Sequence, residues 1–226
     1  MEEFDWKEKV ENKEEKIQLA KKMAQRVKEG ETIGFGSGST SYLTVLEIGK
    51  KVKEENLHIQ AVPTSMIIEN LCHELEIPVV TLERHTLDWC FDGADEVDNQ
   101  HWMIKGMGAA LFREKLNLVN CKENYILIDA TKWVSLLGQR HPVPIECHKL
   151  AVSYVMEEVK KLGATKLELR MSKNTDQPLI TDNGNVILHA WFDKIEEPLE
   201  KQLKQIVGVI ETGLFIGYNV QIVAGA

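Results

Sequence analysis

Short apolar runs alternate with amphipathic segments from Thr32 to Asp129 of this 226-residue chain. The runs are rich in residues that favour strands, and the segments carry apolar residues at helical spacing. Strands are expected at residues 32–35, 59–62, 79–82, 89–91, 102–104 and 125–129, and helices at 10–27, 39–52, 65–75 and 109–119. In the helix at 65–75, the residues expected to point inward are Ile67, Ile68, Leu71 and Leu75. This alternation predicts an α/β fold with a mainly parallel sheet and helices on both of its faces.

The pattern changes near Gly138. The second half is expected to contain a helix at 146–161, a half-buried strand through Leu167, Leu169 and Met171, a hairpin turn at 182–185 and a helix at 195–206. A last strand at 219–223 is expected to return to the first sheet. We therefore predict a smaller α+β domain, residues 138–206, inserted into a main domain of residues 1–137 and 207–226.

The stretch from Asp88 to Lys115 contains most of the candidate catalytic side chains. Its charged and turn-forming residues include Asp92, Asp95, Glu96, Asp98, Lys105, Gly106, Gly108 and Glu114. Asp92 and Lys105 each follow an expected strand, and Glu114 lies on the helix that follows the glycines. Strand ends and helix N-termini meet at one edge of an α/β sheet, which is the usual place for an active site. A calcium loop is excluded by Ala94 and Val97, whereas magnesium stays an alternative.

These side chains are the ones that proton transfer beside a carbonyl group requires. Glu114 is a candidate base that moves a proton between adjacent carbons. Lys105 and the backbone amides of Gly106 to Gly108 are candidate donors to the enediolate oxygen. Asp92 and Asp95 are candidates for holding hydroxyl groups and for moving protons during sugar-ring opening. This chemistry needs neither a redox cofactor nor a metal.

A second candidate site is the Gly/Ser loop at residues 34–40, which joins an expected strand to an expected helix. Free amides and the helix dipole favour a phosphate at such a turn. Ser39 stands where a dinucleotide-binding loop has its third glycine, and no P-loop lysine is present. The loop therefore favours a small phosphorylated metabolite, bound through Ser37, Ser39 and Thr40. A plain tight turn is the alternative.

Charge and composition exclude several other classes of protein. The net charge of −8 argues against a nucleic-acid partner. No apolar run approaches the ~18 residues that a membrane span needs, and the first residues lack the apolar core of a signal peptide. The four cysteines are widely spaced, as in proteins of a reducing compartment, so a cytoplasmic location is expected.

Several motifs in this chain also occur, in the same order, in a known family. GFGSGST, AVPTS, DGADEVD, IKGMGAALFREK, DATK and TDNGNVIL are arranged as in ribose-5-phosphate isomerase of the A type. The sequence resembles this family from about Lys16 to about Phe215. The resemblance implies a Rossmann-like domain with an inserted α+β domain. It also implies interconversion of ribose 5-phosphate and ribulose 5-phosphate without a metal or cofactor, in the non-oxidative pentose phosphate branch.

The resemblance also implies roles for individual residues. Glu114 matches the family's glutamate base. The other positions that match the family's site are Ser37, Gly38, Ser39 and Thr40 for the phosphate, Asp92, Gly93, Ala94 and Asp95 for the sugar, Lys105, Gly106, Met107 and Gly108 as donors, and Lys132 and Lys16 as further substrate contacts. The chain departs from the family at Met107, where the family has glycine, and at Phe112, where threonine is common. A positive φ at Met107 would strain its backbone.

Two other functions remain open at this point. The first is a non-catalytic sensor that binds a sugar phosphate. The departures from the family at Met107 and Phe112 suggest this hypothesis. The second is an acyl-CoA transferase with Glu114 as nucleophile. The aromatic residues and the inserted domain favour a homo-oligomer, either a dimer or a tetramer, with a small sugar phosphate as the other partner.

Overall fold

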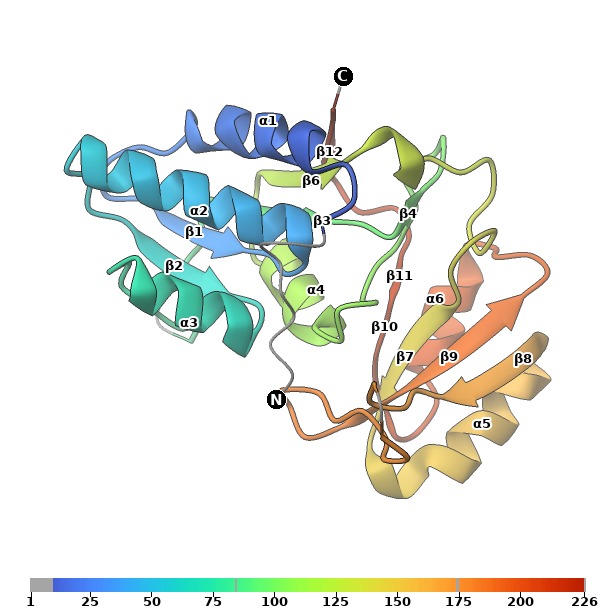
Figure 1. Cartoon of the computed structure of the whole chain (residues 1–226). Coiled ribbons are helices and arrows are strands. Elements are labelled where there is room, and N and C mark those ends of the chain that lie inside the picture. The colour runs from blue at the N-terminus through green and yellow to red at the C-terminus, as the bar shows by residue number, and fades with distance from the viewer. Residues whose placement is uncertain (1–9, 84, 174, 226) are drawn as a thin grey trace. The chain divides into compact units, whose positions relative to one another are not determined.

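The computed structural model describes residues 10–83, 85–173 and 175–225, and its contacts divide the chain into two compact units (Figure 1). Unit 1 contains the chain up to Gly93, Leu116–Thr131 and the chain from Asn219 onward. Unit 2 contains Ala94–Lys115 and Lys132–Tyr218. The domain boundaries expected from the sequence stay a prediction. The observed unit 2 includes Ala94–Lys115 because β5 (Met103–Ile104) pairs with β11 (Leu214–Phe215).

A parallel sheet forms the centre of unit 1 and confirms the predicted α/β fold. Its strands, in spatial order, are β12 (Gln221–Ala224), β6 (Asn124–Ile128), β3 (Trp89–Gly93), β1 (Thr32–Phe35) and β2 (Gln60–Pro63). The helices that lie within this unit are α1 (Lys13–Ala24), α2 (Ser39–Glu54) and α3 (Met66–Glu74). Helix α4 (Leu111–Val119) and the short helix η1 (Ala130–Lys132) have residues in both units. The last strand returns to this sheet as expected.

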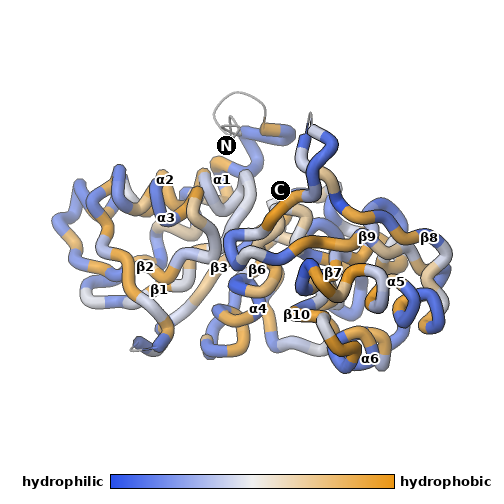
Figure 2. The backbone as a smooth tube through the Cα atoms, turned by 90° about the horizontal axis from the view of Figure 1, so that it is seen from below, coloured by the Kyte–Doolittle hydropathy of each residue, from blue (hydrophilic) through white to orange (hydrophobic). Residues whose placement is uncertain are grey.

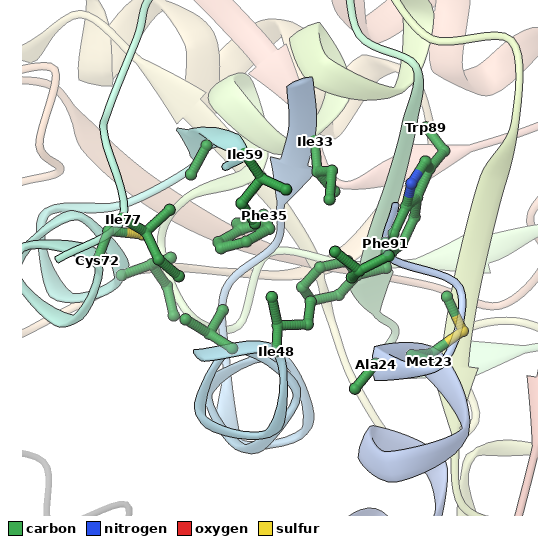
Figure 3. Packing of buried hydrophobic residues seen from close by; sticks show 14 of the residues in the cluster. Met23, Ala24, Ile33, Phe35, Ile48, Ile59, Cys72, Ile77, Trp89 and Phe91 are labelled. Carbon is green, nitrogen blue, oxygen red and sulfur yellow. The ribbon is translucent and has the colours of Figure 1, made fainter. Parts of the chain in front are cut away.

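The core of unit 1 lies between the sheet and its helices. Figure 3 shows side chains of β1 and β3, including Phe35 and Phe91, directed toward α1 and α2. The rings of Phe35 and Phe91 lie 5.3 Å apart between centroids. Side chains alternate along a strand, so Cys90 points to the other face, where it packs with Val62 and Leu87. Both faces of these strands are therefore covered, as in other parallel sheets.

Unit 2 is built on antiparallel strands. One sheet has the order β10 (Val209–Thr212), β7 (Val143–Cys147), β9 (Val186–Phe192) and β8 (Ala164–Leu169), and a smaller one has the order β11, β5 and β4 (Glu96–Val97). Its helices are η2 (Lys149–Ala151), α5 (Val152–Lys161) and α6 (Pro198–Lys204). Val155, Val159 and Leu203 from α5 and α6 are buried in its core. Figure 2 shows apolar stretches along strands of both units.

Three of the expectations about elements and their buried faces were wrong. The helix expected at 146–161 begins only at Val152, because residues 143–147 are the buried strand β7 and residues 149–151 form the short helix η2. The strand expected at 79–82 is a single bridge from Val79 to Ala61. Ile67 is 47% exposed rather than inward-facing. The strand expected at 102–104 is present as β5, although its pairing with β4 and β11 is antiparallel.

Smaller details of the expected elements also differ. Met171 is exposed and lies after the end of β8. The expected turn at 182–185 is present and leads into β9. On the other side of the turn there is no full strand, only an isolated bridge from Ile180 to Val186, the first residue of β9. Within the described ranges, no helix combines the length and the apolar character needed to cross a membrane.

Candidate active site

The Gly/Ser loop of unit 1 joins the end of β1 to the start of α2, as the sequence predicts. Helix α2 begins at Ser39, and Gly38 before it has a φ of 93°, which favours glycine. A Cβ atom on Gly36 would overlap the carboxylate of Asp92. The glycines therefore allow the chain to turn and to pass closely over Asp92. The first amides of α2 have no partner within the helix and can bind an anion.

Asp92, at the end of β3, holds this loop in place. Its Oδ1 accepts hydrogen bonds from the amide of Ser37 at 3.1 Å, the amide of Gly93 at 2.8 Å and the hydroxyl of Ser41 at 3.3 Å. The hydroxyl of Ser37 lies 2.7 Å from that of Thr64. The geometry shows Asp92 as an organiser of the loop, and its expected role as a sugar contact stays a prediction. Reasoning from sequence missed Thr64, although it follows strand β2 in the AVPTS motif.

Lys16 is also brought to the loop, although it lies on α1 and is far from the motif in sequence. Its buried Nζ donates to Oγ of Ser39 at 3.3 Å and lies 3.6 Å from Oδ2 of Asp129. Asp129 follows β6 and accepts the amide of Thr131 at 3.0 Å. Thr40, at the start of α2, is buried. Unit 1 thus places a lysine and three hydroxyl-bearing residues around one helix N-terminus. The role of Asp129 could have been found from the DATK motif, where the sequence singled out only Lys132.

In unit 2, the predicted base and the predicted lysine form an ion pair. Oε2 of Glu114, on α4, lies 3.1 Å from Nζ of Lys105, which follows β5. Glu114 is 6% exposed and Lys105 is 2% exposed. Charges removed from water in this way interact more strongly than charges on the surface. A buried carboxylate beside a buried ammonium can pass a proton to a neighbouring atom and stabilise the charge that results.

The turn between Lys105 and α4 places Asp95 beside it. Asp95 accepts the amide of Met107 at 3.0 Å, and its own amide donates to Ile104 at 2.9 Å. Gly106 has a φ of 100°, and a Cβ there would lie 2.8 Å from Leu111. The residues with positive φ in this turn are Gly106 and Ala109, so Met107 avoids the expected strain. Met107 is half-buried and its neighbour Gly108 is exposed.

The environment of Asp95 favours its protonated form. Burial raises the pKa of Asp95 above its ordinary value. The hydrogen bond from the amide of Met107 and the electrostatic influence of Lys105, His141 and Lys132 oppose this rise in the pKa. Lys132 therefore acts electrostatically on the same carboxyl. Asp95, Lys105, Met107, Glu114 and Lys132 form the unit 2 group of predicted residues that the structure brings together.

The other acids of the acidic run have structural partners. Glu96 is fully buried and accepts the amides of Gly138, Arg140 and His141 at 2.6, 2.6 and 2.7 Å. Asp98 accepts the amides of Gln100 and Trp102, each at 2.9 Å. Among residues 10–83, 85–173 and 175–225, no group of three or more His, Cys, Asp or Glu side chains is arranged to hold a metal ion. The expectation of metal-free chemistry stays a prediction.

Together, a parallel sheet with an anion-binding loop and a buried carboxylate–lysine pair are typical of α/β enzymes that act on small phosphorylated compounds. Comparison with known proteins identifies the group more closely. Residues 60–226 match the family model described as ribose 5-phosphate isomerase A, or phosphoriboisomerase A. The chain belongs to the ribose-5-phosphate isomerase A family.

Individual relatives agree with this assignment. Ribose-5-phosphate isomerase A of a Synechococcus strain is 41% identical over 214 residues, which cover 93% of this chain and 92% of that protein. The solved structure of ribose 5-phosphate isomerase A from Methanocaldococcus jannaschii has a TM-score of 0.91 and 35% identity and covers 96% of each chain. A D-ribose-5-phosphate isomerase solved in complex with phospho-erythronic acid has a TM-score of 0.90 and 39% identity, again over 96% of each chain.

Proposed function

We propose that this chain is an aldose–ketose isomerase that interconverts D-ribose 5-phosphate and D-ribulose 5-phosphate. The observation that carries the proposal is the buried pair of Glu114 and Lys105, 3.1 Å apart, in a member of this family. A relative that is 39% identical binds phospho-erythronic acid, a phosphorylated sugar acid, which supports a phosphorylated sugar as the ligand here. Met107 has no positive φ, so one of the two substitutions that motivated the sensor hypothesis causes no backbone strain.

The proton transfer follows from the chemistry of the pair. In the open-chain aldose, the carboxylate of Glu114 removes the proton from C2, and the electron pair of that C–H bond forms the C1=C2 double bond. O1 of the former carbonyl gains the negative charge, which the ammonium of Lys105 stabilises. Glu114 then returns the proton to C1 while the hydroxyl at C2 becomes the carbonyl. The net result is one proton moved between carbons and one moved between oxygens.

We assign the transfer between oxygens to Asp95. Burial raises the pKa of this carboxyl, so it holds a proton closer to neutral pH than an exposed aspartate does. The amide of Met107 fixes its Oδ2 at 3.0 Å. That amide was expected to serve the enediolate directly, but its bond to Asp95 makes Lys105 the main donor in this proposal.

The phosphate group of the substrate is assigned to the loop of Ser37, Gly38, Ser39 and Thr40. The supporting observations are the start of α2, which has no side-chain cap hydrogen bond, and the buried ammonium of Lys16 beside Ser39. An anion at a helix N-terminus is stabilised by both the amides and the helix dipole. Asp92, Gly93 and Ala94 are assigned to the sugar hydroxyls, and Lys132 to a further substrate contact.

The activity and its independence of metal can be tested together. The purified chain, dialysed against a chelator, is mixed with ribose 5-phosphate, and the ribulose 5-phosphate formed is measured. We expect turnover within about twofold of the rate without chelator, since Lys105 performs the electrostatic role that a metal would have. Ribose without phosphate is expected to react far more slowly. Loss of turnover in chelator with recovery on adding magnesium would contradict the metal-free mechanism.

Two further parts of the proposal concern the state of the protein in the cell. All four cysteines are free thiols, and burial raises the pKa of Cys72 to about 12 and that of Cys147 to about 11. Such thiols suit a reducing compartment, and we propose the cytoplasm. We also propose a homo-oligomer, supported by the large exposed side chains of Leu150 and Val207. Light scattering of the purified protein measures the number of subunits.

A further inference from the structure

Helix α4 carries Arg113, Glu114 and Lys115 in succession. Consecutive residues on an α-helix point in directions that differ by about 100°. Glu114 therefore lies between two cationic side chains that leave the helix on either side of it. Each of these side chains has its own set of partners in unit 2, and neither set includes Glu114.

Lys115 is the more buried of the two. Its Nζ donates to Oε1 of Glu200 at 2.7 Å, to Oε1 of Glu211 at 3.1 Å, and to the carbonyl oxygens of Thr212 and Leu214 at 2.8 and 2.7 Å. Four oxygens from α6, β10 and β11 thus surround one ammonium group.

The partners of Lys115 are themselves fixed. Glu200 also accepts the amide of Ile216 and the hydroxyl of Tyr218, at 2.8 and 2.9 Å. Nζ of Lys115 lies 4.6 Å from the ring centroid of Phe215, and Nζ of Lys105 lies 5.5 Å from that same centroid. A buried ion network of this kind adds little to stability compared with apolar packing, but it defines one geometry.

Arg113 is held by the turn of the TDNGN motif, which the proposed chemistry leaves without a role. Its Nε donates to Oδ1 of Asn183 at 3.0 Å and its Nη2 to the carbonyl of Asp182 at 3.4 Å.

The buried carboxylate of Glu146 fixes this turn from the other side. Its Oε1 accepts from Thr181, Asn183 and Asn185 at 2.9, 3.1 and 2.9 Å. Asn183 therefore links a rigid turn to the residue before the candidate base.

We propose that Arg113 and Lys115 are positioning residues that fix the rotation of α4 and thereby hold the Glu114 carboxylate against Lys105. The inference rests on the proposed role of Glu114 as the base. A carboxylate about 6 Å from a helix axis moves by about 1 Å when the helix turns by about 10°. A misplacement of about 1 Å can slow a reaction by about 10²-fold. Two anchors on opposite sides of Glu114 prevent that rotation.

The test of Lys115 uses a variant in which the lysine and its two carboxylate partners are neutralised together. Lys115→Met alone leaves two buried carboxylates without their cation, so it is combined with Glu200→Gln and Glu211→Gln to remove the charge imbalance. We expect this triple variant to fold, with kcat about 10- to 10²-fold lower and KM changed by less than about threefold. The matched control is Lys204→Met, which removes a lysine 2.9 Å from the other oxygen of Glu211 and is expected to keep its kcat within about twofold.

The Arg113 side chain is about one-third exposed, so its replacement is less disruptive to folding than that of the buried Lys115. Arg113→Met is expected to lower kcat by about 10-fold with KM nearly unchanged. Arg113→Lys keeps the charge but cannot reach both Asn183 and Asp182, so it is expected to recover part of the loss. In both sets of variants, the kinetic isotope effect with ribose 5-phosphate deuterated at C2 is expected to rise, because a misplaced base makes proton transfer limiting. A purely structural role would leave that isotope effect unchanged.

Full kcat and an unchanged isotope effect in Arg113→Met and in the triple variant would overturn the proposal. If the triple variant fails to fold, Arg113→Met alone decides. Measuring Glu114→Gln in the same assay distinguishes a failure of the proposed base from a failure of the positioning role. High activity in Glu114→Gln would refute the proposed base, whereas an inactive Glu114→Gln with fully active anchor variants would refute only the positioning role.

Discussion

Asp95 illustrates how one buried carboxyl links stability to function. Its burial raises its pKa, and the neighbouring amide and cations only partly reverse this effect. In the unfolded chain, Asp95 has an ordinary pKa near 3.8 and loses its proton at lower pH than in the folded state. The folded protein therefore binds the extra proton between these two pKa values. Its stability falls as the pH rises through this window.

Replacing Asp95 with asparagine removes this pH dependence while keeping an acceptor for the amide of Met107. We expect the free energy of unfolding of Asp95→Asn, relative to that of the wild type, to increase as the pH rises from about 4 to about 8. Urea unfolding at a series of pH values measures the difference. The same variant is expected to turn over ribose 5-phosphate more slowly. A stability difference that stayed constant or shrank with rising pH would contradict the raised pKa.

At the scale of elements, the sequence correctly placed the strands that deliver the candidate residues. Strand β1 has the expected bounds, and Asp92, Lys105 and Glu114 lie where β3, β5 and α4 were expected to place them. The repeat of apolar runs and glycine turns is a local signal, and these elements have it. Helix 146–161 was mispredicted because β7 is a strand through its pairing with β9 and β10, which lie far along the chain.

The acidic run shows a second limit of the sequence. Its four acids look alike in the sequence, but Glu96 and Asp98 bind backbone amides of nearby segments, whereas Asp95 lies beside Lys105 and Met107. No spacing rule separates these roles, because the amides that Glu96 binds come from residues 138–141. Likewise, Lys16 reaches Ser39 only through the packing of α1 against α2.

Glu96 is expected to be essential for the attachment of residues 138–141 to β4. Glu96→Ala leaves three partly buried backbone amides without the carboxylate that accepts their hydrogen bonds, so we expect a loss of about 3 kcal/mol in the free energy of unfolding. Glu157→Ala on the exposed face of α5 is the control, and a change within about 0.5 kcal/mol is expected there. Denaturant unfolding compares the two variants. Equal stabilities would show that Glu96 does not anchor this segment.

For the molecule as a whole, the motifs were more informative than the composition. Composition and net charge argued against a nucleic-acid partner and a membrane span, but many α/β enzymes have a similar composition and net charge. The order of GFGSGST, DGADEVD and KGMGAALFREK indicated one family, and the comparisons confirm it. The membership of Ala94–Lys115 in unit 2 had no local signal, because it depends on the pairing of β5 with β11, which lies far along the chain.

The central claim is that the carboxylate of Glu114 moves a proton between C2 and C1 of the sugar. The direct measurement is deuterium incorporation from D₂O into these carbons of ribose 5-phosphate, followed by NMR for the wild type and for Glu114→Gln. Circular dichroism and urea unfolding establish that both are folded. The account predicts steady incorporation by the wild type and at least about 10²-fold slower incorporation by the variant. Incorporation by Glu114→Gln at nearly the wild-type rate would contradict it.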